Sequence, residues 1–153
     1  MIISIDPGKT GAIAIVDGPR LLDVVDMPVF EKDVDAVSLG NIINMFALGF
    51  DCHQVVIEQV SARPKQGVVS TFNFGVSYGI IKGVVGAFGI ETSYVLPQRW
   101  KKDLHLTSDK SDSLMLANEL WPEQSEWFRR KKDDGRAEAA LIGYWKELFD
   151  ASE

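Results

Sequence analysis

The chain alternates short, continuous apolar runs with longer segments in which apolar residues recur every three or four positions. The short runs are typical of strands inside a sheet, and the longer pattern is typical of helices. Strands are predicted at 1–5, 11–17, 20–27, 53–58 and 91–96. Helices are predicted at 36–50, at 71–88 with Ser70 as its cap, from a cap at Thr107 or Ser108 to Trp121, and from Asp133/Asp134 to about Phe149. This order predicts an α/β fold, a mixed sheet flanked by helices, formed by residues 1–153 as a single domain.

Short turns connect the first three strands. Asp17-Gly18 is a hairpin signal between the second and third strands, so these strands are expected to be antiparallel. The turn at 7–11, Pro-Gly-Lys-Thr-Gly, has the lysine and threonine of a phosphate-binding loop but lacks the earlier glycine of that motif. A strand follows it, whereas a phosphate site needs the start of a helix. We therefore interpret it as a hairpin and expect no nucleotide cofactor.

The segment 67–90 is long and apolar enough to cross a bilayer, and Lys82 is its only charged residue. Polar residues such as Asn73 and Ser77 favour a buried helix of a soluble domain, so no membrane association is expected. The sequence begins directly with an apolar strand, which predicts no signal peptide. A single cysteine, Cys52, allows no disulfide framework within one chain and agrees with a cytoplasmic location.

The net charge of −6 argues mildly against general nucleic-acid binding. The basic residues are nevertheless clustered. They gather at Arg63/Lys65, at Arg99/Lys101/Lys102 and at 129–132. A net-acidic protein can still present a basic face, although each cluster taken alone is better explained as solvated surface charge.

Acidic residues stand at the ends of predicted elements. Asp6 ends the first strand, Glu58 ends the fourth, and Asp133/Asp134 and Glu138 open the last helix. The carboxyl ends of parallel strands meet at one edge of a sheet, which is where α/β proteins place their sites. Asp134 and Glu138 are four residues apart and share a helix face. Grouped carboxylates repel unless a cation neutralises them, and their hard oxygens suit Mg²⁺ or Mn²⁺. Taken singly, an aspartate in the position of Asp6 is also common next to a turn, and Asp133 or Asp134 could be an ordinary helix cap.

Five motifs in order resemble the RuvC-type Holliday junction resolvases of the RNase H-like nuclease superfamily, especially the short versions found in phages. These motifs are "IISIDPGKTGAIAIVD", "VVIEQVSARPKQGVVSTFNFGVSYG", "VLPQRWKK", "DKSDSLMLANELWP" and "KKDDGRAEAALIGYW". The resemblance covers nearly the whole chain. It implies an RNase H-like fold with a five-stranded sheet whose first three strands are antiparallel. It also implies an endonuclease that makes paired symmetric nicks in four-way DNA junctions, using two Mg²⁺ ions, for which Mn²⁺ can substitute, at each of two active sites in a homodimer.

The resemblance further implies a catalytic tetrad that would hold the metal ions. By motif position, Asp6 and Glu58 match the first two acids, and Glu138 in "AEA" matches the last. The family usually has two aspartates three residues apart at the end of this set. Here the preceding acid is Asp134 or Asp133, and Asp134 is favoured because it shares a helix face with Glu138.

Lys110 matches a family lysine near the scissile phosphate. Phosphate contacts are hypothesised for Lys9, Arg63, Lys65, Arg99, Lys101 and Lys102, and such contacts position DNA without reading its sequence. Some relatives insert an aromatic wedge from the loop after the second acid, but the 59–67 loop has no aromatic residue. Phe72 and Phe74 follow that loop.

The predicted helix 71–88 contains four regularly spaced glycines, Gly75, Gly79, Gly83 and Gly86. They would let a helix of a partner subunit approach closely, or let this helix pack closely on the chain's own sheet. Three other functions fit parts of the pattern: a nuclease for flaps, forks or other branched DNA, an actin-like ATPase, and a non-catalytic junction-binding module. The ATPase fits poorly because 153 residues leave no room for a duplicated domain.

Overall fold

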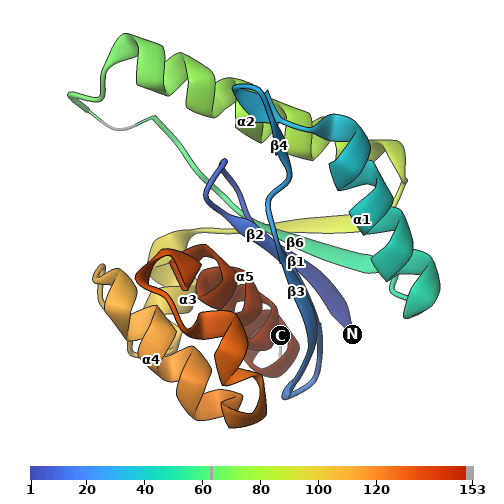
Figure 1. Cartoon of the computed structure of the whole chain (residues 1–153), viewed down its shortest axis with the longest axis vertical. Coiled ribbons are helices and arrows are strands. Elements are labelled where there is room, and N and C mark those ends of the chain that lie inside the picture. The colour runs from blue at the N-terminus through green and yellow to red at the C-terminus, as the bar shows by residue number, and fades with distance from the viewer. Residues whose placement is uncertain (63, 151–153) are drawn as a thin grey trace.

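The computed structural model describes residues 1–62 and 64–150 and contains a five-stranded central sheet. Its strands are β1 (Ile2–Asp6), β2 (Ala12–Asp17), β3 (Arg20–Asp26), β6 (Gln54–Glu58) and β7 (Glu91–Val95), in the spatial order β3-β2-β1-β6-β7. The first three are antiparallel, and β6 and β7 run parallel to β1. The predicted α/β fold with a mixed sheet is confirmed (Figure 1).

The pairing register brings two predicted acids to the same edge of the sheet. Ile5 on β1 pairs with Ile57 on β6, so Asp6 and Glu58 are the next residues on two neighbouring parallel strands. At the other edge, the β2–β3 turn contains Gly18 with a φ of +56°, a conformation that glycine adopts without steric cost.

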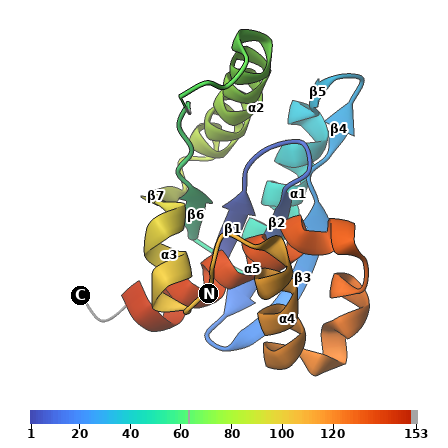
Figure 2. The same ribbon diagram turned by 90° about the vertical axis from the view of Figure 1, so that its left-hand side faces the viewer.

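Helices cover both faces of the sheet. They are α1 (Ala36–Gly49) and α2 (Val68–Ala87) on one face, and α3 (Pro97–Asp103), α4 (Lys110–Leu120) and α5 (Asp134–Trp145) on the other (Figures 1 and 2). Alternate residues of each strand enter different cores, as side chains in a pleated strand must. Ile3 and Ile5 pack with Phe46 of α1 and Ile81 of α2, whereas Ile2 packs in the core that contains α5. Both cores therefore meet at β1.

Helix α5 lies directly against the sheet. A Cβ built on Gly143 would be 2.6 Å from Ser4 Oγ, and one built on Gly135 would be 2.3 Å from the Thr10 carbonyl oxygen. Ser4 Oγ also donates a hydrogen bond of 2.6 Å to the Ala139 carbonyl. This close approach fixes the start of α5 over the edge where β1 and β6 end.

Helix α2 differs from its prediction in start and in burial. It begins at Val68 after Gly67, which provides no side-chain cap, rather than at 71 with Ser70 as the cap. The expectation of a buried helix is wrong, because only Ser77, Ile81 and Val85 are buried and 17% of its most apolar 18-residue window is covered. Within the described residues, α2 is the one helix long and apolar enough to cross a membrane. One face of α2 packs against α1 and the core that α1 shares with the sheet, and the other face is exposed.

Several short elements were not predicted. A small hairpin, β4 (Val29–Phe30) with β5 (Asp33–Val34), lies in the connection after β3. Helix α3 follows β7 directly, with Pro97 at its first position. Helix α4 is capped by Asp109 rather than by Thr107 or Ser108, because Asp109 accepts a hydrogen bond from the Ser111 amide. The remaining elements are η1 (Pro122–Phe128), η2 (Lys131–Asp133) and η3 (Lys146–Asp150).

Candidate active site

Four of the predicted acids gather around the carboxyl ends of β1 and β6. Asp6 and Glu58 come from the strands, and Asp134 and Glu138 come from the first turns of α5. Burial raises the pKa of Asp6 well above its usual value; the negative charges of Glu138 and Glu58, and more weakly Asp134, raise it further, while Lys110 lowers it. Each of the other three carboxylates is thus close enough to act electrostatically on Asp6. The structure brings all four together.

Side chains from two helices, α3 and α4, hold two of these carboxylates. Trp100 of α3, fully buried, donates from Nε1 to Glu58 Oε2 at 2.8 Å. Lys101, the next residue of α3, places its Nζ 2.6 Å from Glu138 Oε1. The Ser113 hydroxyl of α4 lies 3.4 Å from the same Glu138 oxygen. Helix α3, absent from the prediction, therefore contributes to the positions of two acids.

Lys110 is the first residue of α4 and pairs with Asp134, with 2.5 Å between Nζ and Oδ2. This hydrogen bond raises the pKa of Lys110 above its usual value, so the side chain remains a cation at neutral pH. Lys101 and Lys110 together neutralise part of the negative charge that the four acids concentrate here. Both were predicted to act on DNA, and both lie among the acids.

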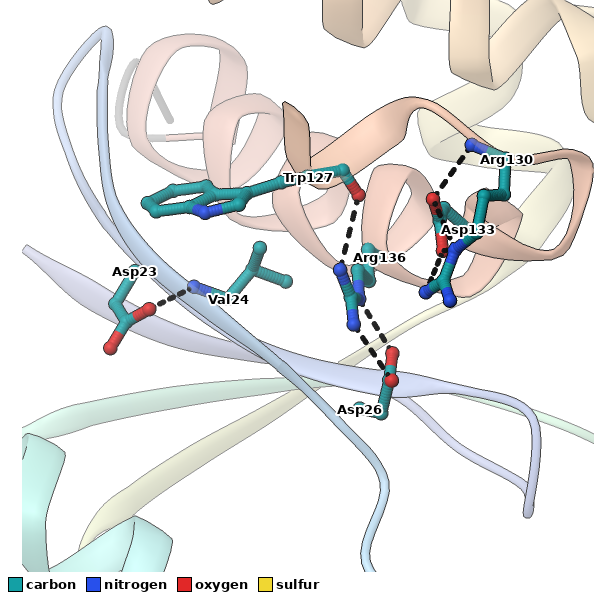
Figure 3. A network of polar contacts seen from close by, with 7 residues as sticks. All are labelled: Asp23, Val24, Asp26, Trp127, Arg130, Asp133 and Arg136. Atoms are coloured by element: carbon teal, nitrogen blue, oxygen red, sulfur yellow. Dashed lines mark hydrogen bonds and ion pairs between the residues drawn. The ribbon is translucent and has the colours of Figure 1, made fainter. Parts of the chain in front are cut away.

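Asp133 points away from this group. Its buried carboxylate accepts bonds from the Arg130 backbone amide at 2.8 Å and from Arg130 Nη2 at 2.7 Å (Figure 3). Burial acts to raise the pKa of Asp133, but the hydrogen bonds from Arg130 outweigh it and lower the pKa below its usual value. Of the two adjacent aspartates, the structure places Asp134 beside Asp6 and Asp133 on Arg130.

A second ion pair ties α5 to the sheet. Arg136 donates from Nε and Nη2 to the two carboxylate oxygens of Asp26, at 2.6 and 2.8 Å (Figure 3). Asp26 ends β3, so this bidentate pair joins the edge strand to the helix turn that lies between Asp134 and Glu138. Neither the Asp26–Arg136 pair nor the Trp100–Glu58 pair was predicted, since each joins residues too far apart for any local spacing to indicate it.

A cleft of about 430 Å³ opens beside the acids. Glu58, Glu138, Lys101 and Lys110 line one part of it. The remaining part is lined by uncharged residues from the loop after β6, from α2 and from the start of α3. A substrate that reached the carboxylates through this cleft would contact both parts.

The other residues predicted to contact phosphates have different surroundings. The Lys9 ammonium donates to the Lys32 carbonyl at 2.7 Å, which ties the β1–β2 turn to the β4–β5 hairpin. The Arg99 guanidinium lies over the Trp145 ring, 5.2 Å from its centroid. Lys65 and Lys102 are exposed. Arg63 lies outside the described residues.

The donor set fits a hard divalent cation by its chemistry. The available ligand atoms are carboxylate oxygens, which Mg²⁺ and Mn²⁺ prefer. Burial raises the pKa of Asp6, and the nearby negative charges of Glu138 and Glu58 raise it further. Across residues 1–62 and 64–150, no three His, Cys, Asp or Glu side chains are already arranged as a ligand group. Lysine ammonium groups occupy positions next to two of the carboxylates instead.

Comparison with known proteins agrees with this architecture. No family model matches the sequence. Over 91 residues, or 58% of the chain, the sequence is 36% identical to the chloroplastic Holliday junction resolvase MOC1 of Chlamydomonas reinhardtii. The chain spans about a tenth of the length of that relative.

Solved structures cover almost the whole chain. RuvC of T. thermophilus, in complex with a Holliday junction substrate, matches 97% of this chain and 95% of its own with a TM-score of 0.60 and 16% identity. The yeast mitochondrial Holliday junction resolvase Ydc2 matches 95% of this chain and 78% of its own, with a TM-score of 0.54 and 13% identity.

The fold and the acid-lined sheet edge define the class of this protein as a RuvC-like RNase H fold. The particular proteins that share the fold or part of the sequence are RuvC of T. thermophilus, solved with a Holliday junction substrate, and two proteins named as Holliday junction resolvases, Ydc2 of the yeast mitochondrion and the chloroplastic MOC1.

Proposed function

We propose that this chain is a metal-dependent endonuclease that resolves four-way DNA junctions. The observation that carries the proposal is the convergence of Asp6, Glu58, Asp134 and Glu138 at one edge of a RuvC-like sheet. The solved T. thermophilus RuvC with this fold is bound to a Holliday junction. The relative identified by sequence is also named as a junction resolvase.

The four carboxylates are the proposed ligands for Mg²⁺, with Mn²⁺ as a substitute and two ions per site. Such ions, when bound, stabilise the attacking and leaving oxygens of a phosphodiester. The chain's own contribution is to orient the carboxylates: Trp100 fixes Glu58, and the close seat of α5 on the sheet fixes Asp134 and Glu138. Lys101 and Lys110 provide cations beside the acids, where a scissile phosphate would lie.

Two symmetric nicks need two active sites, so we propose a homodimer. The exposed face of α2 supports this part of the proposal. Val68, Val69 and Phe72 are 85%, 73% and 70% exposed, and exposed apolar surface on this scale is typical of a protein–protein contact. A Cβ added at Gly75 or Gly79 would lie more than 4 Å from every described atom outside the nearby helix backbone, so a second helix could pack closely here.

The test is cleavage of labelled substrates in Mg²⁺ or Mn²⁺. We expect the purified protein to nick a mobile four-way junction at symmetric positions and to cut flaps, forks and linear duplexes more slowly. Asp6→Asn preserves the size of the side chain but removes its charge and should reduce cleavage at least a hundredfold. Full cleavage by Asp6→Asn would rule out the metal site. Faster cleavage of flaps or forks than of junctions would assign the site to other branched DNA.

A further inference from the structure

Helix α2 reaches the backbone that follows the first acid. Phe74 Cε2 lies 3.5 Å from the position of a Cβ on Gly8, two residues after Asp6. Gly8 has a φ of +113°, a conformation that favours glycine, so the ring meets a tight turn at this point. The Phe74 ring is half-buried and lines the cleft beside the acids. A shift of α2 would therefore reach the turn next to Asp6.

The same helix also reaches the backbone that follows the second acid. One helical turn beyond Phe74, the hydroxyl oxygen of Tyr78 accepts a hydrogen bond from the Val60 backbone, two residues after Glu58. Burial raises the pKa of Tyr78 most, and Tyr94 and then Glu58 add to the shift, so the phenol lies within electrostatic reach of that acid. The loop that leaves β6 leads from Glu58 into the start of α2 (Figure 2).

Lys82 joins α2 to the edge strand of the sheet. Its Nζ lies 5.4 Å from the centroid of the Tyr78 ring and 5.0 Å from that of Tyr94 on β7, and an ammonium group is attracted to the face of an aromatic ring. Tyr94 pairs with the β6 residue that directly precedes Glu58. Phe74, Tyr78 and Lys82, spaced four residues apart, form what we call the contact line of α2.

Helix α2 is itself weakly stabilised by its own chain. Four of its 20 residues are glycine, Gly75, Gly79, Gly83 and Gly86, and each glycine lowers helix stability relative to alanine. Its N-cap residue is Gly67, which has no side chain to cap the helix, and three of its residues are buried. Elements with few buried contacts open locally at low cost in free energy. A lone chain therefore holds the contact line, and the backbone beside the two acids, less firmly than the rest of its core.

The exposed glycines lie next to the contact line on the helix surface. Gly75 directly follows Phe74, and Gly79 directly follows Tyr78, so each glycine is rotated by about 100° around the helix axis from its neighbour. A Cβ at Gly75 or Gly79 would meet no described atom within 4 Å outside the nearby helix backbone. A second helix packed there would restrain α2 along its length, and with it the contact line.

We propose that a second copy of this chain, packed on the glycines of α2, restrains the contact line and thereby raises the affinity of the acids for a divalent ion. Tyr78 and Phe74 are then positioning residues for Glu58 and Asp6. The inference rests on the proposed function and adds to it a coupling between assembly and ion binding. Such coupling is reciprocal: if assembly raises the ion affinity of each site by some factor, the ion favours assembly by the same factor for each site.

The experiment measures both directions of this coupling without DNA. Sedimentation equilibrium gives the dimer dissociation constant of the full chain with saturating Mn²⁺ and without a divalent ion. The electron paramagnetic resonance signal of free Mn²⁺ gives the ion affinity at protein concentrations far below and far above that constant. The wild type and Tyr78→Phe are compared, with Tyr94→Phe as the matched control. Tyr94→Phe also removes a phenol hydroxyl beside Lys82 but leaves the hydrogen bond between Val60 and Tyr78 in place.

We expect each site of the wild-type dimer to bind Mn²⁺ about tenfold more tightly than the monomer, a factor typical of coupled sites. Because a dimer has two sites, saturating Mn²⁺ should lower the dimer dissociation constant by the square of that factor, about a hundredfold. Tyr78→Phe should reduce the difference in ion affinity to about threefold or less, while its dimer dissociation constant without the ion stays within about twofold of the wild type. Tyr94→Phe should behave like the wild type in both measurements.

A second variant tests the inference by a gain instead of a loss. Gly83→Ala meets no described atom within 4 Å outside the nearby helix backbone and strengthens α2 within a single chain. At concentrations where the protein is monomeric, Gly83→Ala should bind Mn²⁺ more tightly than the wild type. A loss of folding cannot produce such a gain.

Four results would overturn the inference while leaving the metal site intact. They are equal Mn²⁺ affinity of the wild-type monomer and dimer, a coupling that Tyr78→Phe leaves unchanged, a monomeric Gly83→Ala that binds Mn²⁺ no more tightly than the wild type, and a wild type that binds Mn²⁺ but stays monomeric at every concentration. A wild type that binds no Mn²⁺ and cleaves no branched substrate would instead overturn the proposed function, and the inference with it.

Discussion

At the scale of single residues, the indole of Trp100 is the side chain that most directly positions a proposed metal ligand. Its hydrogen bond to Glu58 is buried, and bonds to charged groups are worth about 1.5–3 kcal/mol. Trp100→Phe keeps most of the ring and removes the donor. We expect about a tenfold lower cleavage rate and a higher Mg²⁺ concentration for half-maximal cleavage.

The control for this prediction is Trp145→Phe. Trp145 is equally buried and donates to Asp103 at the same distance, 2.8 Å, outside the acid group. The Trp145→Phe variant should lose about as much thermal stability as Trp100→Phe, while its cleavage keeps the wild-type dependence on Mg²⁺ concentration. Equal metal dependence in both variants would mean that Trp100 only fills space.

The adjacent aspartates Asp133 and Asp134 should respond in opposite ways to replacement by asparagine. Asp134→Asn removes a charge from the acid group and should reduce cleavage at least a hundredfold with little change in the melting temperature. Asp133→Asn weakens a buried ion pair with Arg130 and should cost about 1–3 kcal/mol of stability, with cleavage per folded molecule largely retained. Cleavage assays and thermal unfolding of both variants measure this, and the reverse pattern would make Asp133 the ligand.

At the scale of elements, the Asp26–Arg136 pair joins β3 to α5 and should make stability depend on pH. The hydrogen bond from Arg136 lowers the pKa of Asp26 in the folded state, although burial opposes it. The stabilisation is therefore fully present above the unfolded-state pKa of about 3.9 and is lost as the pH falls through the lower folded-state pKa.

Asp26→Asn should consequently destabilise the protein at neutral pH by up to about 1 kcal/mol, since the Asp26 side chain is largely exposed. The difference from the wild type should shrink below about pH 4. Urea unfolding at several pH values measures it. Asp23→Asn on the same strand is the control, because an asparagine can still accept the hydrogen bond from the Val24 amide. A difference that persists at low pH would contradict the electrostatic explanation.

The elements that the sequence predicted are those with a long or strongly apolar pattern. The five sheet strands and the carboxyl-end positions of Asp6 and Glu58 follow from buried runs that local spacing reveals. Helix α3 was not predicted, because a proline after a strand can end that strand as well as begin a helix, and seven residues are too few to show a period.

The partners of the site residues were beyond prediction for a different reason. Trp100 meets Glu58 across 42 residues, and Arg136 meets Asp26 across 110. Such pairs depend on how the helices pack, which no local pattern encodes. In α2, apolar composition was interpreted as burial within the chain, but composition does not say what covers an apolar face.

At the scale of the whole molecule, the open face of α2 predicts an effect on assembly. Gly79→Leu meets no atom of its own chain at the Cβ position, so the monomer should fold normally. A closely packed partner helix would clash with the leucine, and the proposed dimer should dissociate at least tenfold more readily. Sedimentation equilibrium measures this dissociation.

Gly49→Leu is the matched control for assembly. Gly49 ends α1, and a Cβ there also meets no atom, so this variant should associate like the wild type. A monomeric wild type that floats with lipid vesicles would instead assign the α2 face to a membrane surface, since α2 is long and apolar enough to span one.

The two lysines among the acids have a consequence for folding in the absence of a divalent ion. Because Lys101 and Lys110 already balance part of the carboxylate charge, the polypeptide can reach its native structure before any divalent ion arrives. On the proposed function, an incoming divalent ion would compete with the two ammonium groups, which would weaken its retention and would leave those groups able to meet an anionic substrate. The protein therefore balances part of its own carboxylate charge when no ion is bound. A chelator should abolish DNA cleavage without unfolding the protein, and adding the divalent ion back should restore cleavage.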